Sequence, residues 1–230
     1  MSDPFDTATV PGDASFAGAL GAGPFGSVLV PGRFGSSGRA AGLFLMPMLV
    51  AQVETVTARR GQLAGLLSAL TDRLGFMVED RPGVWTTPRR RVIGIAPGRF
   101  LLLGFDESEG RALGPFGWRV RQTGGVALLR LTGPRLTEIL SRGLSLDLDP
   151  RVFRPGSAAV TLLAHMPVTL MRLSDLAGQP VHDIMTGRSY ARGLARWLME
   201  TGAATGVEIN RQEADLSAGG GFFASPRSRA

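Results

Sequence analysis

The 230-residue chain contains no cysteine and no lysine, which excludes several kinds of chemistry. Without cysteine there are no disulfides, no thiol catalysis and no thiolate metal sites, and this fits a reducing compartment. Without lysine a Walker-type phosphate loop is impossible, because that loop places a lysine against the phosphates. All 25 basic residues are therefore arginine, which suits interface ion pairs and the recognition of carboxylate or phosphate groups.

Histidine is also scarce, since only His165 and His182 are present. A zinc site built on them would need carboxylates to complete it, and no GxSxG nucleophile elbow accompanies either residue. His182 is followed by Asp183, and adjacent side chains on a strand face opposite ways. We therefore interpret both histidines as turn or surface residues rather than as catalysts.

Long apolar segments are lacking too. The longest run, from Leu43 to Val53, is broken by Pro47 and is too short for a membrane-spanning helix. The first residues, MSDPFD, are acidic where a secretory signal would be basic. We expect a cytoplasmic protein that does not act at a membrane.

The remaining composition predicts a folded body between two low-complexity ends. Hydrophobic residues make up 44% of the chain and charged residues 19%, which is enough to bury a core. Residues 1–44 are rich in Gly, Ala and Pro without periodicity and indicate an arm, and residues 211–230 indicate a flexible tail. The ordered domain is expected over residues 45–210, in halves of about 45–122 and 123–210.

Hydrophobic periodicity within this body alternates between strand and helix spacing. In each half a strand precedes an amphipathic helix, and the two helices share their apolar spacing, although any two amphipathic helices can do so. The pattern predicts an α+β fold of two ferredoxin-like β-α-β-β-α-β halves. Strands are predicted at 48–57, 92–95, 100–104, 118–121, 126–131, 159–163, 168–173, 184–186 and 207–209. Helices are predicted at 63–74, at 107–113 and from Gly133-Pro134 through Leu140. A last helix is predicted to begin at a Ser189 cap and to place Tyr190, Leu194, Trp197 and Leu198 on its core face.

Two motifs match known ligand sites only in part. Gly21–Gly26 fits GxGxxG, but a dinucleotide site needs a strand before it, a helix after it and an acidic residue about twenty positions on. The stretch before it is irregular, and Pro24 disfavours a helix. Asp147 and Asp149 lack the further oxygen ligands and the glycine of a calcium loop, so we interpret them as turn residues. The residues predict no catalytic group, cofactor site or metal site in this chain.

An excess of positive charge, +6 at neutral pH, suits an acidic partner protein and, by charge alone, nucleic acid as well. The run Arg89, Arg90 and Arg91 lies just before a strand and is predicted to form a partner edge or a solvated strand end. Phe16 and Phe25 in the arm are further candidates for a partner interface. A basic run near an aromatic residue could instead bind single-stranded nucleic acid, although no further aromatic platform lies nearby.

A longer pattern begins at Val126 and reads VALLRLTGPRLTEILSRGLSLDLDPRVFRPG, which joins a strand, a Gly-Pro turn, a helix and a DLDP segment. IAPGRFLLLG upstream and RSYARGLARWL downstream extend it, so that it covers residues 47–209. This pattern resembles the gamma subunit of heterotetrameric sarcosine oxidase, and the gamma-like subunit of N-methylglutamate dehydrogenase is a similar match. Leu144 and Ser145 depart from the family, which often has Cys and Pro there. The residues that carry the resemblance are Gly133, Pro134, Leu140, Gly143, Leu146, Asp147, Leu148, Pro150, Phe153, Gly156, Arg188, Ser189, Tyr190, Ala191 and Trp197.

The resemblance implies a non-catalytic subunit with the fold of folate-binding aminomethyltransferases. Such a subunit would dock on the alpha subunit and stabilise a complex with alpha, beta and delta subunits. The other subunits of such complexes carry FAD, FMN, NAD and tetrahydrofolate, and this chain alone is expected to bind no cofactor. A folate-binding aminomethyltransferase-like protein acting alone stays open as an alternative, with Glu54, Glu138 or Asp147 as its carboxylate.

Overall fold

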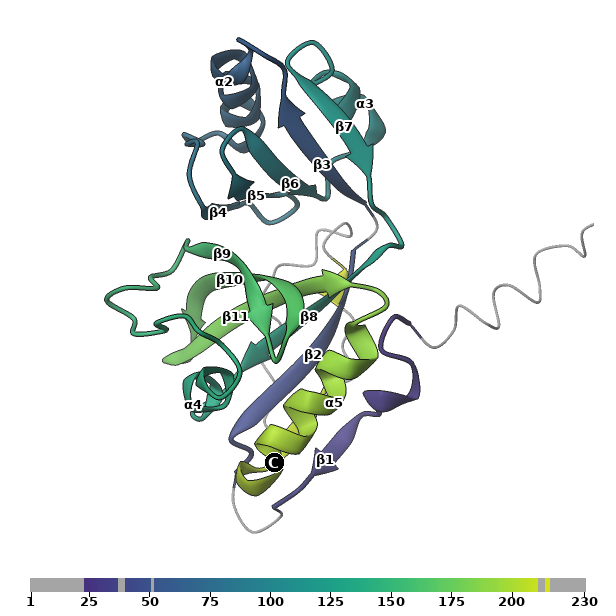
Figure 1. Ribbon diagram of the computed structural model, residues 1–230, viewed down its shortest axis with the longest axis vertical. Helices are drawn as coiled ribbons and strands as arrows, with labels where there is room; N and C mark the ends of the chain where they lie inside the picture. The colour runs from purple at the N-terminus through teal and green to yellow at the C-terminus, as the bar shows by residue number, and fades with distance from the viewer. Residues whose placement is uncertain (1–22, 37–39, 51, 211–213, 216–230) are drawn as a thin grey trace, which may run out of the picture.

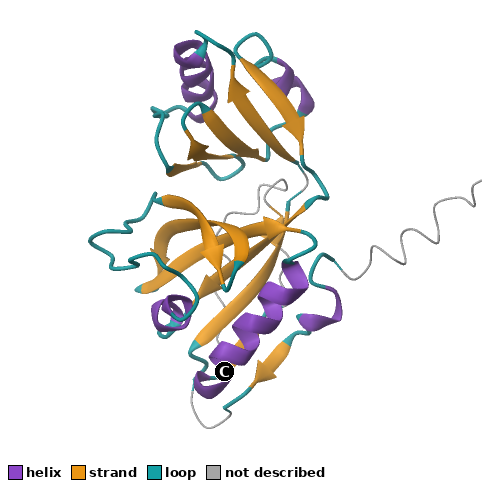
Figure 2. Ribbon diagram, viewed as in Figure 1, coloured by secondary structure: helices purple, strands orange, loops and turns teal. Residues whose placement is uncertain are grey.

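The computed structural model describes residues 23–36, 40–50, 52–210 and 214–215. Two sheets stack face to face, and helices cover their outer faces (Figure 1). Helices α2 and α3 lie on the five-stranded sheet, while α4 and α5 lie on the eight-stranded sheet. The strands form the two inner layers and the helices the two outer ones (Figure 2).

The five-stranded sheet has the strand order β4-β5-β6-β3-β7, and every pairing in it is antiparallel. With β4 set aside, this is the order of a ferredoxin-like β-α-β-β-α-β unit. Its elements are β3 (Val53–Ala58), α2 (Leu63–Leu74), β4 (Gly83–Thr86), β5 (Arg91–Ala96), β6 (Arg99–Leu103), α3 (Glu107–Arg111) and β7 (Gly117–Arg121).

The ends of these helices follow from local sequence. Helix α2 buries Leu66, Leu70 and Leu74 on one face, and it ends at Gly75, whose φ of 78° is the left-handed conformation that glycine adopts at low cost. Helix α3 begins with a capping box, in which the Asp106 side chain accepts from the Glu109 amide and the Glu109 side chain accepts from the Asp106 amide.

The eight-stranded sheet has the order β1-β12-β2-β8-β11-β10-β9, with β13 beside β2. Strand β2 lies between β12, to which it is parallel, and β8, to which it is antiparallel. Strand β2 precedes the five-stranded unit in the sequence, but it completes the eight-stranded sheet. The elements are η1 (Gly26–Val28), β1 (Gly32–Phe34), β2 (Leu43–Leu49), β8 (Val126–Thr132), α4 (Leu136–Ser141), β9 (Ala158–Leu163), β10 (Met166–Leu176), β11 (Gln179–Gly187), α5 (Ala191–Gly202), η2 (Ala203–Thr205), β12 (Val207–Ile209) and β13 (Ala214–Asp215).

Three apolar clusters separate the four layers. One packs α4 and α5 on the eight-stranded sheet, one packs α2 on the five-stranded sheet, and one fills the space between the sheets. The inter-sheet cluster joins Ile93 and Leu103 of one sheet to Leu128, Met171 and Met185 of the other. The two units thus share a core.

The predicted element positions hold with a few differences. The strand predicted at 48–57 is two strands that belong to different sheets. Ser189 does not cap α5, because its N-cap is Tyr190 and makes no side-chain hydrogen bond. Tyr190 is exposed rather than packed in the core, whereas Trp197 packs against the core as predicted.

The described part of the predicted arm belongs to the folded body. Strand β1 pairs with β12, and Phe25 and Leu29 are buried in the cluster under α5. Strand β2 begins at Leu43, within the predicted arm. In the predicted tail, β13 pairs with β2, and the rest of that tail lies outside the described residues.

Candidate functional site

A buried cluster of Arg91, Asp183 and Arg130 joins the two sheets. Arg91 on β5 donates from Nη1 to Oδ2 of Asp183 on β11 at 2.7 Å. Arg130 on β8 donates to the same carboxylate twice, from Nε to Oδ1 at 2.8 Å and from Nη2 to Oδ2 at 2.9 Å. The bidentate Arg130 pair lies within the eight-stranded sheet and fixes the position of the carboxylate, while the bond from Arg91 crosses from the five-stranded sheet.

The electrostatics of the cluster reflect its burial, which is complete for Arg91 and Asp183. Burial alone would raise the pKa of the Asp183 carboxyl, but Arg130 and then Arg91 outweigh it and hold that pKa below its ordinary value. Burial lowers the pKa of Arg91, and Asp183 offsets only part of this effect. For Arg130 the carboxylate outweighs burial, and the pKa is raised.

A cavity of about 590 Å³ lies beside the cluster, between β4 of one sheet and the ends of β10 and β11 of the other. Its walls are mainly apolar. Among the described residues that line it, the charged side chains are all arginine and there is no histidine, aspartate or glutamate. The lining consists of Phe76, Val84, Trp85, Thr86, Thr87, Pro88, Arg91, Arg130, Pro155, Gly156, Arg172, Leu173, Ser174, Leu176 and Val181.

His182 lies on the opposite face of β11 from Asp183, as predicted, but it is a buried residue and not a surface one. Its ring stacks on Phe153 with centroids 6.0 Å apart. Neither ring nitrogen has a hydrogen-bond partner among the described residues. Burial lowers the pKa of His182 to about 4, and the charge of Arg172 acts in the same direction. A neutral imidazole is therefore expected at pH 7, in a packing role.

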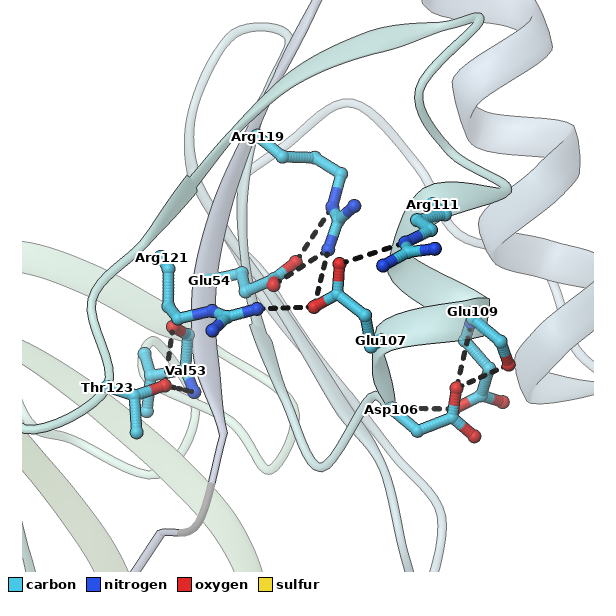
Figure 3. A network of polar contacts seen from close by, with 10 residues as sticks. Val53, Glu54, Asp106, Glu107, Glu109, Arg111, Arg119, Arg121 and Thr123 are labelled. Atoms are coloured by element: carbon cyan, nitrogen blue, oxygen red, sulfur yellow. Dashed lines mark hydrogen bonds and ion pairs between the residues drawn. The ribbon is translucent and has the colours of Figure 1, made fainter.

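The carboxylates proposed for a folate site are each engaged elsewhere. Glu54 on β3 accepts two hydrogen bonds from Arg119 on β7, at 2.8 and 2.9 Å (Figure 3). Glu107 on α3 extends this network to Arg111 and Arg121, as Figure 3 shows. This network ties the edge strand β7 to its neighbours, and none of its members lines the cavity.

The other two carboxylates, Glu138 and Asp147, also lie away from the cavity. Glu138 pairs with Arg135 and Arg142 on the exposed side of α4. Asp147 Oδ1 accepts from the Asp149 amide at 2.8 Å, which confirms the predicted turn role. The three carboxylates are spread over separate elements, so they do not form one site.

The predicted interface residues lie in different environments. Phe16 lies outside the described residues. Phe25 packs inside the core, and Arg91 is buried in the inter-sheet cluster, so neither presents surface in the isolated chain. Arg89 is exposed, and Arg90 is partly buried and pairs with Glu109.

The other sequence motifs take no part in a site. His165, with φ of 66°, is exposed at the turn between β9 and β10, as predicted. Of the GxGxxG match, Gly23 to Phe25 forms a turn, Gly26 is the first residue of the short η1, and Gly21 lies outside the described residues. Among the described residues no group of three His, Cys, Asp or Glu side chains is placed to hold a metal ion. None of the described helices is long and apolar enough to span a bilayer.

The sequence held a signal for the buried cluster that the initial interpretation missed. Arg130 interrupts an apolar strand, and Asp183 stands beside buried positions of another. A charged residue in such a strand is almost never fully buried unless it is paired. This rule predicts a partner for each residue, but it does not identify Arg91, which lies 92 positions from Asp183.

Comparison with known proteins identifies the fold. No protein-family model matches the chain, and no curated protein matches its sequence. A chain of heterotetrameric sarcosine oxidase from Corynebacterium sp. U-96, in complex with pyrrole 2-carboxylate, matches with a TM-score of 0.63 and 22% identity, over 82% of this chain and 94% of that one. Aminomethyltransferase T of the glycine cleavage system from Bartonella henselae matches with a TM-score of 0.49 and 17% identity, over 74% of this chain and 48% of that one. The predicted α+β fold class is confirmed, and the chain has the fold of a sarcosine oxidase chain.

Proposed function

We propose that this chain is the non-catalytic gamma-type subunit of a heterotetrameric, flavin-dependent N-methyl amino acid oxidase or dehydrogenase. It docks on the alpha subunit and stabilises the assembly. The beta and delta subunits complete the complex, and FAD, FMN, NAD and tetrahydrofolate are bound by the other subunits.

The observation that carries this proposal is the extent of the structural match. The similarity covers 94% of a chain from a heterotetrameric enzyme, and this supports a subunit role for the chain as a whole. The polar groups of the described residues support a non-catalytic role. The candidate carboxylates are held in ion pairs or turns, and His182 is enclosed in a core. The described residues that line the cavity include no carboxylate and no histidine.

Strand β7 is the surface we favour for docking. It is an edge strand of its sheet, so the hydrogen-bonding groups on its outer side face no further strand among the described residues. Trp118 and Val120 on one face of β7 are 61% and 58% exposed, and Arg59 lies 3.6 Å over the Trp118 ring. An apolar strip flanked by arginine suits a partner with apolar and acidic side chains. Arg89, which is exposed in the turn between β4 and β5, is a separate candidate contact.

The test is coexpression of the tagged chain with the alpha, beta and delta subunits of its host, followed by affinity purification and gel filtration. A yellow complex that contains all four chains and oxidises sarcosine or N-methylglutamate is expected. Recovery of a colourless, solitary chain under conditions in which the other three subunits assemble would overturn the proposal.

A charge substitution then tests the docking surface. Val120→Glu places a charge on the exposed face of β7 and should lower the yield of complex by about tenfold or more, because a buried unpaired charge weakens an interface strongly. Val152→Glu is the matched control, since Val152 is 62% exposed and lies in the turn region before β9. Equal yields for both variants would exclude β7 as the docking surface.

A further inference from the structure

Strand β7 directs main-chain hydrogen-bonding groups to its outer side, and the register of the sheet identifies them. The Gln122 amide, just beyond the end of β7, donates to the Val53 carbonyl of β3 at 2.8 Å, and the pairing continues along β7 without a shift in register. In an antiparallel pair only every second residue bonds to the neighbouring strand. The amide and carbonyl groups of Arg119 and Arg121 therefore point away from β3, toward a side where the described residues place no strand (Figure 1).

The charged side chains of β7 leave this edge open. Arg119 donates to Glu54 of the neighbouring strand, and Arg121 donates to Glu107 of α3 (Figure 3). Charged side chains that project across an edge strand normally protect it from pairing with another strand. These two arginines are instead held by carboxylates on the face of the sheet that α3 covers.

The opposite face of β7 is apolar and uncovered. Val120 lies opposite Thr55 on β3, two residues from Val53, which is buried in the inter-sheet cluster. Trp118 and Val120 therefore lie on the inner face of the five-stranded sheet, but both are exposed. The eight-stranded sheet leaves this part of the inner face free, and a strand placed beside β7 would continue it.

We infer that an extended segment of the partner subunit adds to the five-stranded sheet as a strand beside β7. This inference rests on the proposed subunit role and specifies how docking occurs. Main-chain hydrogen bonds to Arg119 and Arg121 supply affinity in this mode of recognition, and alternate side chains supply specificity. Residues of the segment next to Trp118 and Val120 are apolar, and those next to the two arginines are acidic, because such cross-strand pairs stabilise a sheet.

Charge complementarity favours a partner subunit over a second copy of this chain. Arg119 and Arg121 share one face and one side of the hydrogen-bonding pattern. Two copies of β7 paired antiparallel about a twofold axis would therefore set arginine opposite arginine, and like charges directly opposite each other destabilise a pair of strands. The isolated chain is expected to be a monomer in gel filtration. A dimer in which the Arg119 and Arg121 amides are protected from exchange would refute the assignment to a partner subunit.

Hydrogen exchange measures the added strand directly. Mass spectrometry with fragmentation to single amides would compare the isolated chain with the coexpressed four-subunit complex. In the isolated chain the amides of Trp118 and Val120, which face β3, should exchange slowly, and those of Arg119 and Arg121 should exchange fast. In the complex the two arginine amides should slow by about tenfold or more.

The outcomes separate this inference from the proposed function. Unchanged exchange of the Arg119 and Arg121 amides in an intact complex would exclude strand addition and leave the subunit role in place. Failure of the unmodified chain to assemble would overturn both.

The amide of Val160 on the edge strand β9 is the internal control. The Arg172 amide donates to the Ser157 carbonyl, so by the same alternation the Val160 amide points outward from its sheet. Its exchange is expected to be fast in both samples. Protection of Val160 in place of Arg119 and Arg121 would put the added strand on β9 and contradict the assignment to β7.

A proline substitution separates the main chain of β7 from its side chains. Arg121→Pro removes an outward amide and keeps the bonds to β3, and edge strands accept proline at such positions. Arg121→Ala is the matched control, because it loses the same side chain but keeps the amide. The yield of complex is expected to be about tenfold or more lower for Arg121→Pro than for Arg121→Ala, since a carbonyl of the partner loses its donor.

Circular dichroism establishes that both variants are folded before the comparison. Equal yields of complex from the two folded variants would count against strand addition. If Arg121→Pro does not fold, the exchange rates of the unmodified chain decide, since they require no substitution.

Discussion

Replacing His182 by leucine should raise the free energy of unfolding, and by an amount that grows as the pH falls. His182 is buried against Phe153, and its two ring nitrogens have no hydrogen-bond partner among the described residues. A buried polar group without a partner costs about 1–3 kcal/mol, so leucine should stabilise the protein by about 1 kcal/mol at pH 7, after allowance for the lost ring contact.

The pH dependence follows from the lowered pKa. The pKa of His182 falls from 6.5 to about 4 on folding, because burial opposes the charged imidazolium. Between these values the unfolded chain binds a proton that the folded chain does not, so stability is fully present above pH 6.5 and is lost as the pH falls toward 4. The histidine therefore lowers the free energy of unfolding by about 2 kcal/mol at pH 5 and by about 3 kcal/mol at pH 4, relative to pH 7.

Urea denaturation at pH 7, 6, 5 and 4.5 measures this effect as the difference between His182→Leu and the parent chain. The difference removes the contribution of carboxylates, which titrate in both proteins. His165→Asn is the control, because His165 is exposed and asparagine tolerates its positive φ. A stability difference between His182→Leu and the parent that stays constant over this pH range would refute the reasoning.

Two further predictions concern the junction of the sheets. Asp183→Asn should lower the free energy of unfolding by about 3–5 kcal/mol in urea, because two buried guanidinium groups lose their carboxylate. Asp175→Asn, at an exposed partner of Arg172, should cost about 1 kcal/mol or less, and equal losses would contradict the burial argument. A fragment of residues 123–210 should remain unfolded by circular dichroism, because β2 is missing between β12 and β8, and fusion of residues 40–49 should restore a cooperative transition.

Local periodicity was sufficient to predict most elements. The helix predicted at 63–74 is α2, and the strand predicted at 207–209 is β12, each with the predicted bounds. In both segments the apolar spacing matches one face that packs on a core. Such positions depend on residues that are close in the sequence, so a single sequence is enough to predict them.

Long-range pairing was not predictable in the same way. The apolar pattern from Met48 to Thr57 gives no sign that one strand ends and another begins within it. Both β2 and β3 bury residues on more than one face, so their side chains do not alternate cleanly between apolar and polar. Only pairing shows that β2 belongs with β8 and β12. The burial of Phe25 was equally unpredictable, because its glycine-rich surroundings carry no periodicity and the burial depends on packing near α5.

The position of Asp183 and His182 on opposite faces of one strand separates two contributions to the fold. Asp183 faces the other sheet, where its loss should disturb the docking of the sheets. His182 faces the helix-covered core, where its replacement by leucine should raise stability. Because the residues are adjacent, the backbone of β11 is common to both variants. A loss of stability with Asp183→Asn and a gain with His182→Leu would therefore show that the two faces of this strand contribute to stability with opposite sign.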